Sequence, residues 1–414
     1  MSIDPAPSRL DTRLPRLTRL NTTPQSAPLP EPEPAARAAS AALCQHIAEQ
    51  IVAAGGWISF ARYMALALYA PGLGYYSGGA QKFGAAGDFI TAPEISPLFA
   101  HSLATPAVWV MQHSAPHILE VGAGSGLLAV DLLAELERLG QLPERYAILE
   151  VSGELRARQQ ATAQSRIPHL YERMVWLDHL PEKFSGFVLG NEVLDAMPVE
   201  LVEWHAEGML QERGIALDEH GQFCWFNRPA TGRLREAAQQ LDLQGVFPYV
   251  CEIGLIARAW VAEWSQHLEQ GALLLIDYGF PRHEYYLPQR NNGTLMCHYR
   301  HHAHDNPLWW PGLNDITTHV DFSAIADAGF NAGLDVLGYT HQAQFLLNCG
   351  ITTALARLAD AGETRHRAYL SAVRNVEKLI LPHEMGELFK VIAFGRKIPP
   401  TLPGFQSGDR LHTL

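Results

Sequence analysis

The clearest pattern of apolar and polar positions along the chain lies between His117 and Leu139. A short apolar run leads into a glycine-rich turn, after which apolar residues recur at helical spacing. The pattern predicts a buried strand over His117–Val121, a sharp turn, and an amphipathic helix that Gly140 caps at its C-terminus. The predicted core face of that helix carries Leu127, Leu128, Val130, Leu132, Leu133, Leu136 and Leu139.

Further apolar runs, bounded by turn residues, predict more strands, at Tyr146–Val151, Val175–Leu177, Phe187–Leu189, Leu273–Asp277 and Leu388–Phe394. Helices are predicted between the strands, over Gly153–Gln164 and over residues 320–329, 352–360 and 366–378. Strands that alternate with helices indicate an α/β fold with a parallel, doubly wound sheet.

The N-terminal part differs from this pattern. Residues 1–38 are rich in Pro, Arg, Ser and Thr and are predicted to be a disordered tail. Helices are predicted over Ala41–Ala54 and Phe60–Tyr69, and a glycine-rich, aromatic loop follows until a helix starts at Ser96. This loop is too long and too aromatic for a plain linker, so we expect it to bind a ligand. Residues 39–108 are therefore expected to form an N-terminal helical and glycine-loop extension.

Residues 109–396 are expected to form the main α/β domain, followed by a tail over 397–414. Two insertions interrupt it. The first, 199–250, contains alternating strand pairs that we interpret as an inserted β-hairpin region, either a cap or the surface of a homodimer. The second, 281–380, begins with an irregular, aromatic and His-rich segment over 281–325 and continues into extra C-terminal helices.

The composition narrows the classes of partner. The 414 residues include 31 Lys and Arg against 43 Asp and Glu, a formal net charge of −12, which argues against binding a nucleic-acid backbone and fits a cationic substrate. No apolar run approaches the length of a membrane span. The five cysteines are scattered without a Cys-x-x-Cys pair, which indicates free thiols in a reducing compartment. We expect a cytoplasmic protein, or a mitochondrial one if the source is eukaryotic.

The glycine-rich turn carries Glu120 and then Gly122-x-Gly124-x-Gly126. The dinucleotide fingerprint has one more residue before its third glycine, and an acid in front of the first is unlike it. The turn therefore suits a ligand with a charged amino-acid tail, although an NAD-dependent oxidoreductase stays an alternative. Glu150, near the end of the next predicted strand, can accept hydrogen bonds from both hydroxyls of a ribose. These features resemble the class I S-adenosylmethionine methyltransferases, in which the glycines would cradle the methionine part of the cofactor.

A second group of candidates follows the predicted strand Phe187–Leu189. By position this is the place beside the transferred methyl group in a class I methyltransferase, where adenine methyltransferases carry an Asp/Asn-Pro-Pro-aromatic motif. This chain has Asn191, Glu192 and Asp195 there. Two carboxylates suit a guanidinium group, which pairs with a carboxylate through two parallel hydrogen bonds. The three residues are our candidate catalytic group; alternatively, Glu192 caps a helix and Asp195 is solvated.

Other candidates come from single positions. Asp88, in the glycine-rich loop, is a candidate for binding the cofactor's amino group or for ordering a lid. Asp277 and Tyr278 end a predicted strand and are candidates for contact with substrate, or Asp277 satisfies backbone donors in the turn. The cluster from His298 to His304 is interpreted as a polar loop, with no metal site, because no helical His-x-x-x-His pair with a carboxylate is present.

The motifs together point to one family. GYYS, KFGAAGDFITAPEISPLFA, LEVGAGSG, LEVSGELRARQ, GNEVLDAMPVE, LLLIDYG, GTLMCHYRHH, PGLNDITTHVDF and MGELFKV occur in this order. Between about residues 40 and 396 the chain resembles the MidA family, bacterial and mitochondrial proteins related to the complex I assembly-factor arginine methyltransferase. One departure is Ala123, where family members often have proline.

The resemblance implies a class I S-adenosylmethionine fold and methyl transfer to an arginine of a protein substrate. In the mitochondrial relatives the product is symmetric dimethylarginine, and assembly of the NADH dehydrogenase complex is supported. Two alternatives stay open: a methyltransferase for a small molecule, and a non-catalytic assembly chaperone that retains the cofactor fold.

Overall fold

The computed structural model describes residues 29–78, 90–241, 243, 246–359 and 363–414. The chain divides into two units, Met1–Glu31 and Pro32–Leu414. The elements below belong to the second unit. Within the described residues, no helix is long and apolar enough to cross a membrane.

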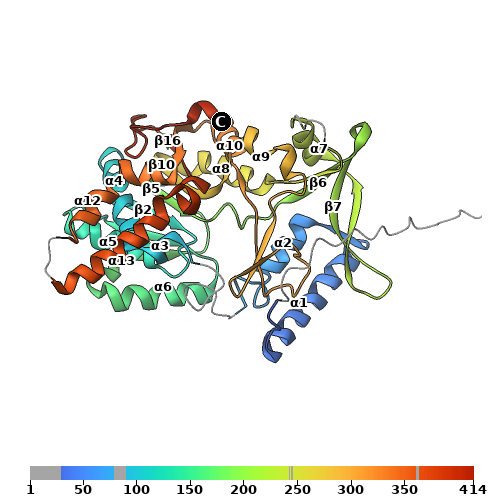
Figure 1. Cartoon of the computed structure of the whole chain (residues 1–414). Helices are drawn as coiled ribbons and strands as arrows, with labels where there is room; N and C mark the ends of the chain where they lie inside the picture. The colour runs from blue at the N-terminus through green and yellow to red at the C-terminus, as the bar shows by residue number, and fades with distance from the viewer. Residues whose placement is uncertain (1–28, 79–89, 242, 244–245, 360–362) are drawn as a thin grey trace, which may run out of the picture. The chain divides into compact units, whose positions relative to one another are not determined.

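A central sheet of eight strands organises the described part of this unit (Figure 1). Seven strands follow in the spatial order β15-β16-β10-β5-β2-β3-β4, and the short β14 (Val320–Asp321) pairs with β10. The five strands from β10 to β4 are parallel, while β16 is antiparallel to both of its neighbours. The bounds are β2 His117–Val121, β3 Arg145–Leu149, β4 Met174–Leu177, β5 Phe184–Asn191, β10 Leu268–Phe280, β15 Asp335–His341 and β16 Phe389–Arg396.

The sheet is buried on both faces because apolar residues follow one another along each central strand. In β10, Leu274 and Ile276 pack into one hydrophobic cluster, and Leu273 and Leu275 pack into the other. Side chains alternate across a strand, so a continuous apolar run supplies both faces. This is why the short apolar runs of the sequence predict central strands.

Helices cover the two faces (Figure 1). The first cluster includes residues of α4 (Pro97–His113), α5 (Leu127–Arg138), α11 (Gln342–Asn348), α12 (Ile351–Ala356) and α13 (Glu363–Ile380). The second includes residues of α8 (Leu255–His267) and α10 (Phe322–Asn331). The remaining α-helices of the described residues are α1 Pro34–Ala53, α2 Phe60–Tyr69, α3 Ala92–Ile95, α6 Gly153–Arg166, α7 Gly232–Gln239 and α9 Arg282–Tyr285.

Two smaller sheets lie outside the central one. An antiparallel sheet has the order β1-β7-β6-β9, with β8 paired to β7, and a three-stranded sheet has the order β12-β11-β13. The second sheet lies in the segment that we expected to be irregular, so that prediction was wrong for these residues. Their strands are too short for a recognisable periodicity. The bounds are β1 Trp57–Ser59, β6 Glu200–Trp204, β7 Leu210–Leu217, β8 Phe223–Pro229, β9 Tyr249–Ile253, β11 Met296–Tyr299, β12 His302–His304 and β13 Asp315–Thr317.

Most predicted elements are confirmed, with boundaries that move by several residues. The helix predicted from Ala41 begins at Pro34, because proline is well suited to the first helical turn. Ser96 caps α4 as expected, since its hydroxyl accepts a hydrogen bond from the backbone of Leu98 at 3.3 Å. In the segment expected to be a C-terminal tail, Leu402 and Phe405 are buried in the first hydrophobic cluster.

Candidate active site

The glycine turn between β2 and α5 depends on left-handed backbone conformations. Gly122, Gly124 and Gly126 have φ values of 66°, 51° and 80°. Residues with a Cβ rarely adopt these values, whereas glycine does so at little cost. At Gly126 a Cβ would also lie 3.1 Å from the Cα of Gln159. The turn keeps its backbone open to the space above the carboxyl ends of the strands.

Glu120 lies beneath this turn and is almost fully buried. The hydroxyl of Tyr146 donates a hydrogen bond to its Oε2 at 2.6 Å. Burial raises the pKa of Glu120 to about 7, with a further upward contribution from Glu150, and the hydrogen bond from Tyr146 opposes the shift. Glu120 is therefore partly protonated at neutral pH.

Glu150 follows β3 directly and lines the same space. Its Oε1 accepts a hydrogen bond from the backbone of Ser152 at 2.8 Å, and its Oε2 accepts one from Nε2 of Gln159 at 2.9 Å. Burial raises its pKa, and these hydrogen bonds oppose the shift. A carboxylate oxygen has two acceptor positions, so Glu150 retains acceptor capacity for ligand hydroxyls.

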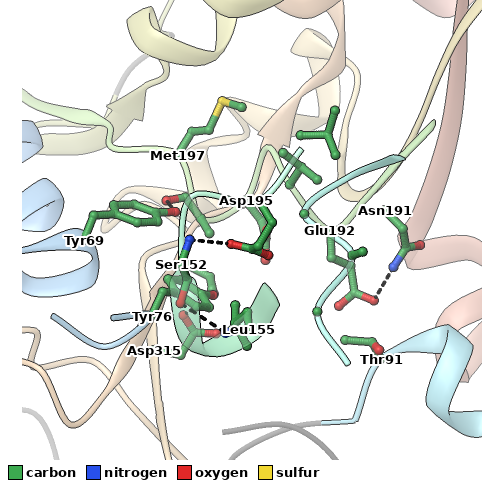
Figure 2. A pocket seen from close by; sticks show the side chains of 18 of the residues that line it. Tyr69, Tyr76, Thr91, Ser152, Leu155, Asn191, Glu192, Asp195, Met197 and Asp315 are labelled. Carbon is green, nitrogen blue, oxygen red and sulfur yellow. Dashed lines mark hydrogen bonds between the residues drawn. The ribbon is translucent and has the colours of Figure 1, made fainter. Parts of the chain in front are cut away.

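Asn191 and Glu192 stand where β5 ends. Glu192 adopts a φ of 52°, a strained value for a residue with a side chain. Nδ2 of Asn191 donates to Oε1 of Glu192 at 3.1 Å (Figure 2), while the buried Oδ1 of Asn191 has no partner among the described residues. Burial, followed by the charge of Asp195, raises the pKa of Glu192 to about 8. A strained backbone at a half-buried acidic residue is typical of a functional site.

Asp195 lies on the loop after β5, and a hydrogen bond from Tyr278 of β10 holds its side chain in place. The hydroxyl of Tyr278 donates to its Oδ2 at 2.6 Å, and its buried Oδ1 has no hydrogen-bond partner among the described residues. Burial raises its pKa to about 6, and the hydrogen bond from Tyr278 opposes the shift. The two carboxyl groups thus titrate at different pH values, as in many acid-base pairs.

Asp277 accepts hydrogen bonds from backbone donors in the turn, which is the second of the two roles considered for it. Its Oδ2 accepts hydrogen bonds from the backbone of Leu194 at 2.8 Å and of Asp195 at 3.2 Å, and its Oδ1 accepts one from the backbone of Tyr278 at 2.9 Å. Asp277 is fully buried and is not among the lining residues, whereas Tyr278 is. It therefore fixes the loop that carries Asp195.

Another wall of the cavity is formed by Tyr69, Tyr76 and Asp315; Tyr76 belongs to the start of the aromatic loop that we expected to bind a ligand. The hydroxyl of Tyr76 donates to Oδ1 of Asp315 at 2.8 Å, and Tyr69 stacks on Tyr76 with ring centroids 5.5 Å apart. The hydroxyl of Tyr69 donates to the backbone oxygen of Ala196 at 2.9 Å, beside Asp195. In the sequence, the motif PGLNDITTHVDF is the signal that could have pointed to Asp315.

Together these residues line one cavity of about 870 Å³, within the range of ligand sites. Figure 2 shows the carboxyl groups of Glu192, Asp195 and Asp315 around it, with Tyr69 and Tyr76 beside them. Its described lining also includes Glu120 and Glu150 but no Lys or Arg. His319 adds no charge at neutral pH, because burial lowers its pKa to about 4. The cavity is therefore anionic.

Asp88 and the His298–His304 cluster are the remaining predicted features. Asp88 lies outside the described residues. His298 lines the cavity, while Nε2 of His304 lies 3.0 Å from Oδ1 of Asn314. In the described part of the chain, no three His, Cys, Asp or Glu side chains form a group that could hold a metal ion.

The strand order and the glycine turn place this cavity where open α/β sheets bind ligands. The model of a family described as "Putative S-adenosyl-L-methionine-dependent methyltransferase" matches residues 102–340, more than half of the chain. The chain belongs to this family of S-adenosylmethionine-dependent methyltransferases. It is the MidA family that the motifs indicated, and the cofactor is S-adenosylmethionine.

Relatives cover most of this MidA-family chain. It is 30% identical to the mitochondrial protein arginine methyltransferase NDUFAF7 of Danio rerio over 84% of the chain and 85% of the relative. It is 31% identical to the same protein of Mus musculus, with 87% and 86% covered. A solved structure of a likely methyl transferase from Burkholderia thailandensis, bound to S-adenosyl-homocysteine, has 51% identity and a TM-score of 0.88, and covers 94% of this chain and 100% of that chain.

The residues of this MidA-family chain fit the cofactor. The left-handed glycines leave backbone exposed along the cavity, and the carboxyl groups of Glu120 and Glu150 lie at the ends of adjacent strands. Carboxylates at these two positions suit an ammonium group and ribose hydroxyls, and no pyrophosphate-binding cation lines the cavity in the described residues.

Proposed function

We propose that this methyltransferase methylates arginine side chains of a protein substrate. The observation that carries the proposal is the anionic cavity, whose described lining holds five carboxyl groups and no Lys or Arg. A guanidinium is always charged, and carboxylates bind it through paired hydrogen bonds. The relatives in Danio rerio and Mus musculus are named protein arginine methyltransferases, which supports the same substrate class.

The chain's own residues have distinct proposed roles. When bound, the cofactor supplies an electrophilic methyl group on its sulfonium. The backbone of Gly122, Gly124 and Gly126 would hold its methionine part, Glu150 its ribose, and Glu120 its amino group. Asp88 stays a candidate for the amino group as well.

Glu192 and Asp195 would orient the guanidinium and localise its charge, and Asn191 would hold Glu192 in place through its 3.1 Å hydrogen bond. The nitrogen that gains the methyl group must lose one proton. Glu192, in its ionised form, is the proposed acceptor, because a carboxylate whose pKa is raised to about 8 is a stronger base than an ordinary glutamate. Tyr278 would contact substrate beside Asp195.

The test compares a deletion strain with its parent. Mass spectrometry of the proteome should reveal an arginine site that is dimethylated in the parent only; symmetric dimethylation is the expected form. The purified protein with labelled cofactor should then label a protein band in the deletion lysate. Label that appears only in small molecules would support the small-molecule methyltransferase. Cofactor binding with no label in either fraction would support the assembly chaperone.

Three further expectations belong to the same proposal. The cytoplasmic location, the homodimer formed through the β6–β8 region and support of complex I assembly stay predictions. Cell fractionation, light scattering and the amount of assembled NADH dehydrogenase complex in the deletion strain test them in turn.

A further inference from the structure

The three-stranded sheet presents one polar face to the cavity. In β11 and β13, Met296 pairs with Thr317 and His298 pairs with Asp315. Side chains alternate across a strand, so these four residues share a face, and all four line the cavity. Between them Cys297 and Ile316 are buried in the hydrophobic cluster that contains residues of α1 and α2. This alternation orients the side chain of Asp315 toward the cavity.

Asp315 lies close to the proposed catalytic carboxyl groups. The next residues of the chain lead to Thr318, whose backbone N–H donates to the backbone oxygen of Asp195 at 3.0 Å. The charge of Asp315 also contributes to raising the pKa values of Glu192 and Tyr69. Asp315 is buried, with 3% of its surface exposed. The cavity therefore brings together carboxyl groups from two parts of the chain.

Tyr69 and Tyr76 complete this wall. Their stacked rings lie beside Asp315 and line the cavity (Figure 2). Aromatic rings next to carboxylates suit a planar guanidinium, which stacks on rings while its N–H groups reach oxygen acceptors. The hydrogen bond from Tyr76 needs only a neutral acceptor, which an asparagine would supply. The negative charge is what aspartate adds at this position.

We propose that Asp315 is a substrate-binding residue that, together with the Tyr69–Tyr76 wall, selects a cationic side chain over a neutral one of the same shape. The inference rests on the proposed arginine methyltransferase function. It adds a third anionic contact, from the three-stranded sheet, to those of Glu192 and Asp195. Arginine would then be preferred to citrulline, which has nearly the same shape without the charge.

The test measures binding of acetyl-Gly-Arg-Gly-amide and its citrulline counterpart to the full-length protein saturated with S-adenosylhomocysteine. Asp315→Asn keeps an acceptor for Tyr76 and removes the charge. We expect the preference for arginine to fall roughly tenfold or more, as for loss of a hydrogen bond to a charged group. The affinity for S-adenosylhomocysteine should be unchanged. Asp315→Ser should give the same loss and serves if the asparagine variant does not fold.

The control is Asp335→Asn, which removes an exposed carboxylate on β15 and should keep the full preference. A second readout is the pH dependence of methylation, whose rising limb should move to lower pH in Asp315→Asn because one charge that raises the pKa of Glu192 is gone. If the wild-type protein binds both peptides equally, the proposed function itself fails. If it prefers arginine and Asp315→Asn keeps that preference, only the role of Asp315 is overturned.

Discussion

At the residue scale, Glu192 combines a left-handed φ of 52°, a half-buried position and a pKa of about 8. We predict that Glu192→Gln lowers kcat by at least roughly 100-fold, since a removed general base typically costs this much. Binding of S-adenosylmethionine, measured by calorimetry, should persist, because glutamine keeps the size and the hydrogen-bonding ability of the side chain. Turnover close to that of the wild type would exclude Glu192 from proton transfer.

The pH dependence of activity is also set by the ionisation of single residues. Asp195 has a pKa of about 6 and Glu192 of about 8, and both must be ionised to hold a guanidinium between them. The guanidinium does not titrate in this range. We therefore predict that kcat/KM rises with pH between about 6 and 8, where it reports the free enzyme. A profile that falls over this interval would contradict the assignment.

At the scale of elements, the β2–α5 turn is the part of the site that the sequence predicts best. We predict that Gly124→Val abolishes cofactor binding, because the new side chain enters the cavity that Gly124 lines. Gly140→Val is the matched control, since Gly140 has a φ of 68° and open space around it. Both substitutions strain the backbone by about 1–3 kcal/mol, but only Gly124→Val should lose binding in a calorimetric titration.

The lengths of the strands explain which site residues can be predicted from the sequence. Glu120 and Glu150 follow apolar runs directly, and Glu192 comes three residues after the run Phe187–Leu189. The local order of strand and acid is therefore enough to place them at the carboxyl ends of the strands. Asp315 belongs to a three-residue strand whose partner, β11, has only four residues. Such strands are too short for a periodic signal, and their pairing is set by tertiary packing. Tyr76 also lines the cavity, and its hydroxyl contacts Asp315, which lies 239 residues away in sequence.

At the scale of the whole molecule, ionisation of the carboxyl groups in the cavity lowers the free energy of unfolding of the ligand-free protein. Glu120 and Glu192 have pKa values raised to about 7 and about 8, above those of an unfolded chain. A carboxyl group whose folded pKa is raised stabilises the fold while it stays protonated, and this stability is lost as the pH rises through the folded pKa. His319, with its lowered pKa of about 4, acts in the opposite direction but mainly below pH 6.5.

Between pH 6.5 and 8, Glu120 and Glu192 therefore determine how the free energy of unfolding changes with pH. We predict that the free energy of unfolding of the ligand-free protein falls by roughly 2 kcal/mol over this interval, measured by urea denaturation. Glu192→Gln should flatten the curve and be more stable than the wild type at pH 8, because an amide needs no ionisation. Since the same substitution should remove activity, the charge at Glu192 would serve the reaction at the expense of stability. A wild-type protein whose stability is constant or rises from pH 6.5 to 8 would refute this account of the cavity.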